Sequence, residues 1–473
     1  MTSLLLVTSL LLAPAMAATR PHILMIVVDD LGWMDVGWRD PDMHTPTLDR
    51  FVSEGVNLTN HYVQPLCSPS RAAFMTGKYP FKMGMQDTVL KATYDASLPL
   101  GLTTLPEHLQ TLNYATHMVG KWHLGFCNLD MTPTYRGFDS FYGMYLGKGD
   151  YYDHTGFLNG YDLWDNATAE WSAAGTYSTH LFTDRVLDIL QAHDPAAKPI
   201  FIYLAYQAVH GPLEVPEYYE TQFCSHVSDP SRKTHCAMTA AVDEGIANIT
   251  DALENLGYTD NLLTVFTTDN GGPVTLGSSN WPLRGGKSTL WEGGTRAVSF
   301  LHSDTLLNGP YTWDGLMHAV DWYPTLVRAA GDKTTISGID GVNQWNRIKR
   351  NGNSVRSEFV YNINEVKNTS AIRVNQWKLI YNKPGEPDGW HNPPTGVTAP
   401  ADPSGPYDTY MLFDIDNDPE EMYDVKSSNP TVLSDMQAKL AAYEAELVSA
   451  ETGNFVEGSK PQYWGGTWST GWC

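Results

Sequence analysis

The segment Cys67-Ser68-Pro69-Ser70-Arg71 combines a nucleophilic side chain with a cation. Pro69 favours the first turn of a helix, because its missing N–H would have no intrahelical partner there. The N-terminus of such a helix presents free backbone N–H groups, which attract an anion and stabilise a nearby nucleophile. Arg71 adds a guanidinium within one turn of Cys67. The segment therefore predicts an anion-binding loop that turns into a helix, with Cys67 at its mouth.

Two other interpretations compete for Cys67. Most lone cysteines are small buried hydrophobes or halves of disulfides. A cysteine-dependent phosphatase loop would place its arginine six residues after the cysteine, and Ala73 occupies that position. The local segment thus disfavours a phosphatase loop but leaves a buried or disulfide-bonded cysteine open.

Acidic residues directly follow two predicted strands. His22–Val28 and 262–268 are short apolar runs typical of strands buried on both faces, and they end in Asp29-Asp30 and Asp269-Asn270. The carboxyl ends of parallel strands meet at one edge of a sheet, although an isolated Asp-Asp is more commonly a solvated turn. Carboxylates brought together there would repel unless a cation joined them. Hard oxygen donors favour Ca²⁺ or Mg²⁺ over zinc.

Cationic and imidazole side chains follow two further predicted strands. Residues 115–119 precede Lys121 and His123, which would point to the same side of an extended backbone, and residues 199–206 precede His210. A glycine-rich segment carries Lys287 and suits a loop that lies over an anion. Attack on a negatively charged tetrahedral ester requires cations around the nucleophile and the metal. This shell comprises Arg71, Lys121, His123, His210 and Lys287.

The pattern of elements predicts an α/β fold with a large mixed, mostly parallel sheet flanked by helices. Helical periodicity over 179–191, 238–256 and 317–330 alternates with the buried strands. After about residue 355, short strands separated by Gly and Pro, and a final helical stretch, predict a smaller α+β domain with an antiparallel sheet. We therefore divide the chain into residues 1–17, 18–355 and 356–473.

The charge balance limits the class of partner. The 473 residues carry a formal net charge of −23, which argues against nucleic acid because phosphate backbones require basic patches. The same acidity requires any anion-binding pocket to be locally basic.

The first 17 residues have the pattern of a secretory signal peptide. An apolar core from Leu4 to Ala13 precedes Ala15-Met16-Ala17, a small-x-small cleavage pattern. The run is too short to span a bilayer and no later window is better, so we expect no membrane insertion. If Cys67 is catalytic, four cysteines remain for an oxidising compartment; Cys224 with Cys236 and Cys127 with Cys473 is one of three formal pairings.

Six further segments accompany the cysteine segment: Val28-Asp-Asp-Leu-Gly-Trp33, Gly120-Lys-Trp-His-Leu-Gly125, Arg136-Gly-Phe-Asp139, Thr268-Asp-Asn-Gly-Gly272, Asn280-Trp-Pro-Leu-Arg-Gly285 and Ser288-Thr-Leu-Trp-Glu-Gly-Gly294. With Cys67-x-Pro-x-Arg71 they resemble the sulfatase family of the alkaline phosphatase superfamily, from about His22 to the C-terminus. Within that family the likeness is greatest to the arylsulfatase B (N-acetylgalactosamine-4-sulfatase) group.

The resemblance implies a modified nucleophile and one metal ion. A formylglycine-generating enzyme would oxidise Cys67 to formylglycine during maturation, and the aldehyde hydrate would then be the nucleophile. The resemblance also implies that Asp269 helps to deprotonate the attacking hydroxyl. One Ca²⁺ would be bound by the modified Cys67 and by Asp29, Asp30, Asp269 and Asn270.

The resemblance also implies roles for the basic residues. His210 and Lys287 would hold the sulfate and protonate the leaving oxygen. Lys121 and Arg71 would stabilise the oxyanion of the hydrate. His123 would help to remove a proton from the second hydroxyl, which expels sulfate.

The expected activity is hydrolysis of sulfate esters, of sulfated carbohydrates or aryl sulfates. Similarity to the arylsulfatase B group favours sulfated glycosaminoglycan sugars such as N-acetylgalactosamine 4-sulfate, in an extracellular or lysosomal protein. Two alternatives stay open, because fold alone does not specify the substrate. One is a phosphodiesterase or phosphonate hydrolase of the same superfamily; the other is an inactive secreted binding protein whose Cys67 remains a thiol.

Overall fold

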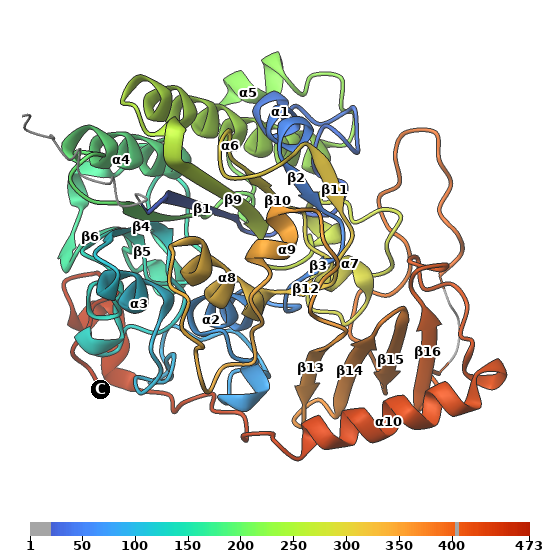
Figure 1. The fold of residues 1–473 in the computed structure, drawn as a ribbon. Coiled ribbons are helices and arrows are strands. Elements are labelled where there is room, and N and C mark those ends of the chain that lie inside the picture. Colours follow the sequence, from blue (N-terminus) through green and yellow to red (C-terminus); the bar gives the residue numbers. More distant parts are fainter. Residues whose placement is uncertain (1–19, 403–405) are drawn as a thin grey trace, which may run out of the picture.

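A ten-stranded sheet forms the centre of the molecule (Figure 1). The computed structural model describes residues 20–402 and 406–473, so the predicted signal peptide over residues 1–17 lies outside the described residues. Within the described ranges, no helix combines the length and apolar character needed to cross a membrane.

The middle of this sheet is parallel, as predicted. Strand β1 pairs in parallel with β8 and β9, and β4 pairs in parallel with β8 and β5. Strand β10 runs antiparallel to β9, and β6 runs antiparallel to β5, so the whole sheet is mixed. In spatial order the strands are β11 (Tyr311–Trp313), β2 (Val56–Leu58), β10 (Ser299–His302), β9 (Leu262–Thr268), β1 (His22–Val28), β8 (Ile200–Tyr206), β4 (Ala115–Lys121), β5 (Ser140–Met144), β6 (Trp164–Asp165) and β7 (Thr168–Ala169).

Helices cover both faces of the sheet (Figure 1). Alternate side chains of β1 enter opposite cores: Ile23, Met25 and Val27 belong to one hydrophobic cluster, and Leu24, Ile26 and Val28 to the other. The first cluster includes residues of α2 (Cys67–Thr76), α3 (Leu105–Thr111), α8 (Trp322–Ala329) and α9 (Trp345–Lys349). The second includes residues of α1 (Pro46–Glu54), α4 (Ser178–Ala192), α5 (Glu217–Gln222) and α6 (Pro230–Asn255). The continuous apolar sequence of β1 follows from this burial on both faces.

The C-terminal region forms a separate four-stranded antiparallel sheet, which confirms the predicted second sheet. Its order is β13 (Glu358–Asn364), β14 (Thr369–Val374), β15 (Trp377–Tyr381) and β16 (Tyr410–Asp414). Helix α10 (Pro430–Glu444) lies along this sheet (Figure 1). The boundary at residues 355 and 356 stays a prediction.

The predicted helix over residues 317–330 is wrong in its first turn. Residues Met317–His318 form strand β12, which pairs with β3 (His61–Tyr62), and a short 3-10 turn follows before α8 begins at Trp322. The His318 ring accepts a hydrogen bond from the backbone N–H of Val320, and Asp321 accepts one from the backbone N–H of His318. This reciprocal capping gives the chain a start signal that apolar spacing does not reveal.

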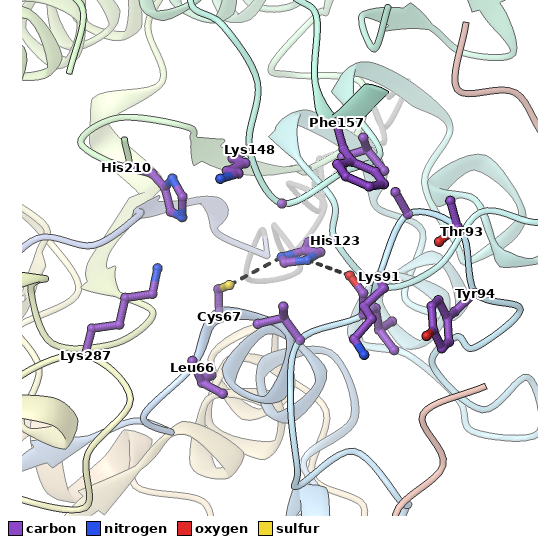
Figure 2. Close-up of a pocket in the computed structure, with 15 residues that line it drawn as sticks. Leu66, Cys67, Lys91, Thr93, Tyr94, His123, Lys148, Phe157, His210 and Lys287 are labelled. Atoms are coloured by element: carbon purple, nitrogen blue, oxygen red, sulfur yellow. Dashed lines mark hydrogen bonds between the residues drawn. The ribbon is translucent and has the colours of Figure 1, made fainter. Parts of the chain in front are cut away.

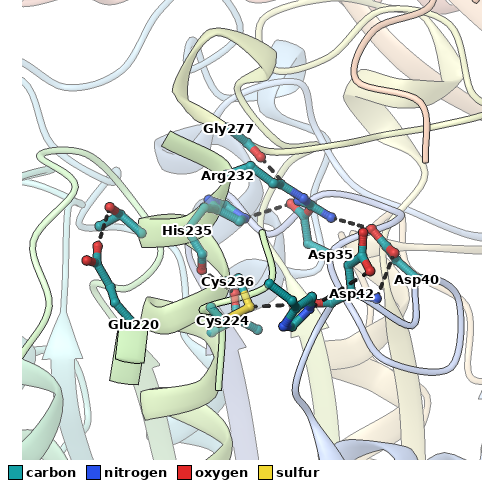
Figure 3. The surroundings of a disulfide bond; sticks show 12 residues. Asp35, Asp40, Asp42, Glu220, Cys224, Arg232, His235, Cys236 and Gly277 are labelled. Carbon is teal, nitrogen blue, oxygen red and sulfur yellow. Dashed lines mark hydrogen bonds and ion pairs between the residues drawn. A yellow bond between two sulfur atoms is a disulfide. The ribbon is translucent and has the colours of Figure 1, made fainter. Parts of the chain in front are cut away.

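Both disulfides join the cysteines in one of the three pairings that the sequence left open: Cys127 with Cys473, and Cys224 with Cys236. Figure 3 shows the second bond beside a buried ionic network on the loop that follows β1. Arg232 forms ion pairs with Asp35 and Asp40, and His235 Nε2 lies 2.8 Å from Asp35 Oδ2. The network fixes the chain that leaves β1 against the start of α6.

A buried lysine links the C-terminal sheet to the large domain. Lys378 on β15 places its Nζ 3.0 Å from Glu292 Oε1, on α7 (Glu292–Thr295), and 2.8 Å from Glu421 Oε1. Burial raises the pKa of Glu421 to about 7. Burial also opposes ionisation of Glu292, but Lys378 and then Arg296 hold the pKa of Glu292 at about 2.

We expect the Lys378→Met variant to lose about 3–5 kcal/mol of unfolding free energy, because buried Glu421 loses its counterion and buried Glu292 keeps only the more distant Arg296. Lys426→Met is the matched control, since Lys426 pairs with Asp408 and Asp424 at the surface. The control should lose at most about 1 kcal/mol. Urea unfolding followed by circular dichroism measures both, and equal losses would contradict the structural role of Lys378.

Candidate active site

Cys67 is the first residue of α2 and lies on the floor of a cavity of about 490 Å³ (Figure 2). Its side chain is buried, and of the described cysteines it alone is free of a disulfide. The prediction placed Cys67 in a loop before the helix; instead Leu66 is the N-cap, in extended conformation. The Cys67 side chain is therefore held within the first helical turn.

His123 faces Cys67 with a defined ring nitrogen. Its Nε2 lies 3.1 Å from the Leu90 carbonyl, and its Nδ1 lies 3.3 Å from Cys67 Sγ. Burial, followed by the charges of Lys121 and Arg71, lowers the pKa of His123 well below its usual value. Because a carbonyl only accepts, the proton of the neutral ring resides on Nε2. The Nδ1 lone pair thus points at the Cys67 side chain.

Four of the five predicted metal ligands, Asp29, Asp30, Asp269 and Asn270, meet at the carboxyl edge of β1 and β9. The parallel register pairs Val28 with Thr268, so the residues that follow lie side by side. Oxygen or sulfur ligand atoms of Asp29, Cys67 and Asp269 all lie within 4.8 Å of one another. The Oδ1 atoms of Asp29 and Asn270 are buried without a hydrogen-bond partner. Unpaired buried acceptors among carboxylates fit a hard divalent cation.

Three cations surround these carboxylates. Lys121 donates to Asp29 Oδ2, Arg71 Nη2 lies 2.8 Å from Asp269 Oδ2, and Lys287 Nζ lies 2.5 Å from Asp30 Oδ1. Burial and the neighbouring Asp269 raise the pKa of Asp29 to about 7. Burial also opposes ionisation of Asp30, but Lys287 and then His210 hold the pKa of Asp30 below its usual range.

His210 completes the ring of basic side chains around the cavity. Its Nδ1 lies 2.7 Å from the Gly211 carbonyl, and its Nε2 lies 3.6 Å from Asp30 Oδ2. Tyr151 donates to the backbone carbonyl of His210 and holds this loop in place. Burial lowers the pKa of His210 to about 3. In the absence of an anion the ring is neutral, with its proton on Nδ1.

The structure brings all the predicted site residues to one edge of the sheet, but the backbone at His123 is not extended as expected, and two further positions share its left-handed conformation. Asp30 has φ 66°, His123 has φ 56° and Ser288, beside Lys287, has φ 76°. Non-glycine residues rarely adopt this left-handed region, and each such residue costs about 1 kcal/mol or more. The residues brought together are Asp29, Asp30, Cys67, Arg71, Lys121, His123, His210, Asp269, Asn270 and Lys287.

Sequence reasoning missed the residues of the cavity rim. They are Lys91, Thr93, Tyr94, Lys148 and Phe157. Lys148 comes shortly after strand β5 (Ser140–Met144), which was not predicted, and the other four do not follow a buried strand. The fold brings their two loops together over the cysteine, so no local pattern distinguishes them. The segment 136–165 contributes Lys148 and Phe157 to this rim and also contains strand β5.

Comparison with known proteins agrees with this geometry. The family model for sulfatases matches residues 21–332, and a model described as the C-terminal region of aryl-sulfatase matches residues 354–468. This chain therefore belongs to the sulfatase family and is a hydrolase of sulfate esters.

Individual relatives cover most of the chain. Arylsulfatase J of Mus musculus is 40% identical over 95% of this chain and 80% of its own length. N-acetylgalactosamine-6-sulfatase of Mus musculus is 29% identical over 79% of this chain and 74% of its own length. The crystal structure of Ps i-CgsB with k-i-k-neocarrahexaose is 29% identical, with a TM-score of 0.80, over 92% of this chain and 94% of that one.

We expect a hard divalent cation to stabilise the folded protein, by about 2.7 kcal/mol at one hundred times its dissociation constant. The Asn270→Ala variant should bind the ion more weakly and shift Tm less on addition of Ca²⁺ or Mg²⁺. Asn417→Ala, at an exposed position, is the control. Calorimetric titration checks both variants. Equal ion binding by Asn270→Ala and the wild type would exclude Asn270 as a ligand.

Proposed function

We propose that this protein cleaves sulfate esters with a formylglycine made from Cys67 and one Ca²⁺. The substrates that we propose are sulfated glycosaminoglycan sugars such as N-acetylgalactosamine 4-sulfate. One observation carries the proposal: Cys67 Sγ lies on the cavity floor against the His123 Nδ1 lone pair and among the paired carboxylates. We further propose that the protein enters the secretory pathway and is extracellular or lysosomal. Its two disulfides suit an oxidising compartment.

An unmodified thiol is a poor nucleophile in this site. Burial raises the pKa of the Cys67 thiol, against the opposing effects of Lys121 and Lys287. Oxidised to formylglycine and hydrated, the same position supplies an oxygen nucleophile and a second hydroxyl whose deprotonation expels sulfate. Because Cys67 is buried in the folded chain, the formylglycine-generating enzyme would act before the cavity closes.

The buried oxygen atoms support the choice of Ca²⁺. Carboxylate and amide donors suit a hard cation, and two of these oxygen atoms have no other partner. A Ca²⁺ ion held there supplies Lewis-acid stabilisation of the sulfate and of the attacking oxygen. The proposed ligands are Asp29, Asp30, Asp269, Asn270 and the modified Cys67.

The remaining residues transfer protons, stabilise the oxyanion or hold the sulfate. Asp269 helps to remove the proton of the attacking hydroxyl, and Lys121 and Arg71 stabilise the resulting oxyanion. Lys287 and His210 hold the sulfate. The added negative charge of the substrate favours protonation of His210, which then donates from Nε2 to the leaving oxygen. The other hydroxyl loses its proton with assistance from His123.

Mass spectrometry of the peptide that contains Cys67 tests the nucleophile. We expect an aldehyde in place of the thiol, reducible by borohydride, in protein secreted from a eukaryotic host. That protein should hydrolyse 4-nitrophenyl sulfate. An unmodified thiol, with the host's modifying enzyme shown to be active, would contradict the mechanism and favour a binding role. A higher kcat/KM on a phosphonate monoester than on the sulfate would favour the alternative hydrolase.

The Cys67→Ser variant tests the need for the second hydroxyl. Its single hydroxyl is expected to form a sulfate ester that cannot expel sulfate, so turnover should fall by about 10⁴-fold or more. The measurement is a burst of nitrophenol close to one equivalent, together with a mass spectrum in which the peptide carrying the introduced serine is sulfated. Cys67→Ala, which has no nucleophile, should give no burst. Sustained turnover by Cys67→Ser would contradict the proposed release step.

A further inference from the structure

The outer half of the catalytic cavity differs in charge from the rest of the protein. The chain has 53 Asp and Glu residues against 30 Lys and Arg residues. The fifteen described residues that line the cavity nevertheless include three lysines, two histidines and no carboxylate. This local excess of positive charge favours an anionic ligand.

Two of these lysines have no counterion among the described residues. Lys287 pairs with Asp30, but Lys91 and Lys148 are exposed and form no ion pair with any described residue. The Lys91 ammonium instead lies 4.7 Å from the centre of the Tyr94 ring. Two free ammonium groups on one cavity repel each other, and a ligand anion would relieve that repulsion.

The positions of these side chains separate them from the reacting sulfate. Figure 2 shows Lys287 and His210 on one side of Cys67, whereas Lys91 and Tyr94 lie beyond His123. Lys148 lies between His210 and Phe157 in the same view. A sulfate monoester carries one negative charge, and the side chains on the Lys287 side of the cavity already balance that charge. The two free lysines therefore face the alcohol portion of the ester.

Phe157 adds an apolar surface to this outer half. This residue is 58% exposed, an unusual position for a phenylalanine, and its ring stacks on buried Trp468 with centroids 6.3 Å apart. Contact with Trp468 restrains the ring while one face remains free. A fixed aromatic face beside cationic groups suits a sugar ring that carries anionic substituents.

We propose that Lys148 and Lys91 form a second anion subsite, with Phe157 as the surface on which the sugar rests. The substrate is then an oligosaccharide with at least two negative charges: the sulfate that is cleaved, and a carboxylate or second sulfate that the lysines bind. This inference rests on the proposed function and makes its substrate class more specific.

Selectivity between two substrates tests the subsite. One is 4-nitrophenyl sulfate, with a single charge; the other is a disaccharide of a hexuronate and a sulfated N-acetylhexosamine. We expect Lys148→Ala and Lys91→Ala each to lower the ratio of kcat/KM, disaccharide over aryl sulfate, about three- to fivefold, mainly through KM. The double variant should lower the ratio about tenfold. Lys148→Arg should restore most of it, and added salt should reduce all these differences.

Controls separate the subsite from general electrostatics. Lys333→Ala removes an exposed lysine that does not line the cavity and should leave the ratio unchanged. A disulfated N-acetylhexosamine without uronate identifies the second anion. If the lysine variants lower the ratio of kcat/KM for this sugar over aryl sulfate, the lysines bind a second sulfate. If they lower the ratio only for the disaccharide, the lysines bind its carboxylate. A ratio unchanged in the double variant, or lowered equally by Lys333→Ala, would overturn the subsite.

A binding measurement keeps this test distinct from that of the mechanism. Calorimetric titration of the Cys67→Ala protein with the same disaccharide requires no turnover. The Lys148→Ala substitution in that background should weaken binding about three- to fivefold. If wild-type protein with verified formylglycine fails to hydrolyse aryl sulfate, the proposed function fails; if the titrations show equal affinity, the second anion subsite fails.

Discussion

Three carboxylates buried at the carboxyl edge of β1 and β9 are the constraint on which the site depends. Parallel pairing in register brings Asp29-Asp30 beside Asp269-Asn270, and the burial of these residues removes the water that would otherwise solvate the negative charge. Such a group is tolerated only when cations surround it closely. The positions of Arg71, Lys121 and Lys287 follow from this requirement, since each contacts one of the three carboxylates.

The same ion pairs position Cys67. Arg71 lies one turn after Cys67 on α2 and also donates through Nη1 to the Lys121 carbonyl, 2.8 Å away. This bond connects α2 to the end of β4, from which His123 follows directly. The carboxylates, the helix and the histidine therefore form one connected unit. We attribute the left-handed backbone at Asp30 and His123 to this unit, because its contacts over-determine both residues.

The protein combines a strongly acidic composition with a cavity that has no acidic lining residue among those described. The carboxylates near Cys67, such as Asp29 and Asp269, are buried and do not line the cavity; they are paired with cations or suit a metal ion. The cationic side chains thus serve two different purposes. Some balance buried carboxylates, and others, such as Lys148, remain free for a ligand.

The sequence by itself determined the sheet class and most helices, and it predicted the residues that the structure brings together around Cys67. Strands buried on both faces have uninterrupted apolar sequences. The residues that follow them lie together at the carboxyl edge of a parallel sheet. The C-terminal antiparallel sheet was equally predictable from its short strands and turn residues. The apolar spacing predicted the wrong start for the helix at 317–322. The capping hydrogen bonds of His318 and Asp321 start the helix later than this pattern suggests.

Only the tertiary structure decided which nitrogen of His123 faces Cys67, because that depends on the carbonyl of Leu90, 33 residues away in sequence. It also decided the disulfide pairing, which needs short distances between cysteines that sequence cannot supply. The cavity rim is the clearest case. Lys91 lies on one loop, and Lys148 and Phe157 lie on another, between β5 and β6. The sequences of these loops carry no periodic signal, and only the packing of the whole chain brings them over one cysteine.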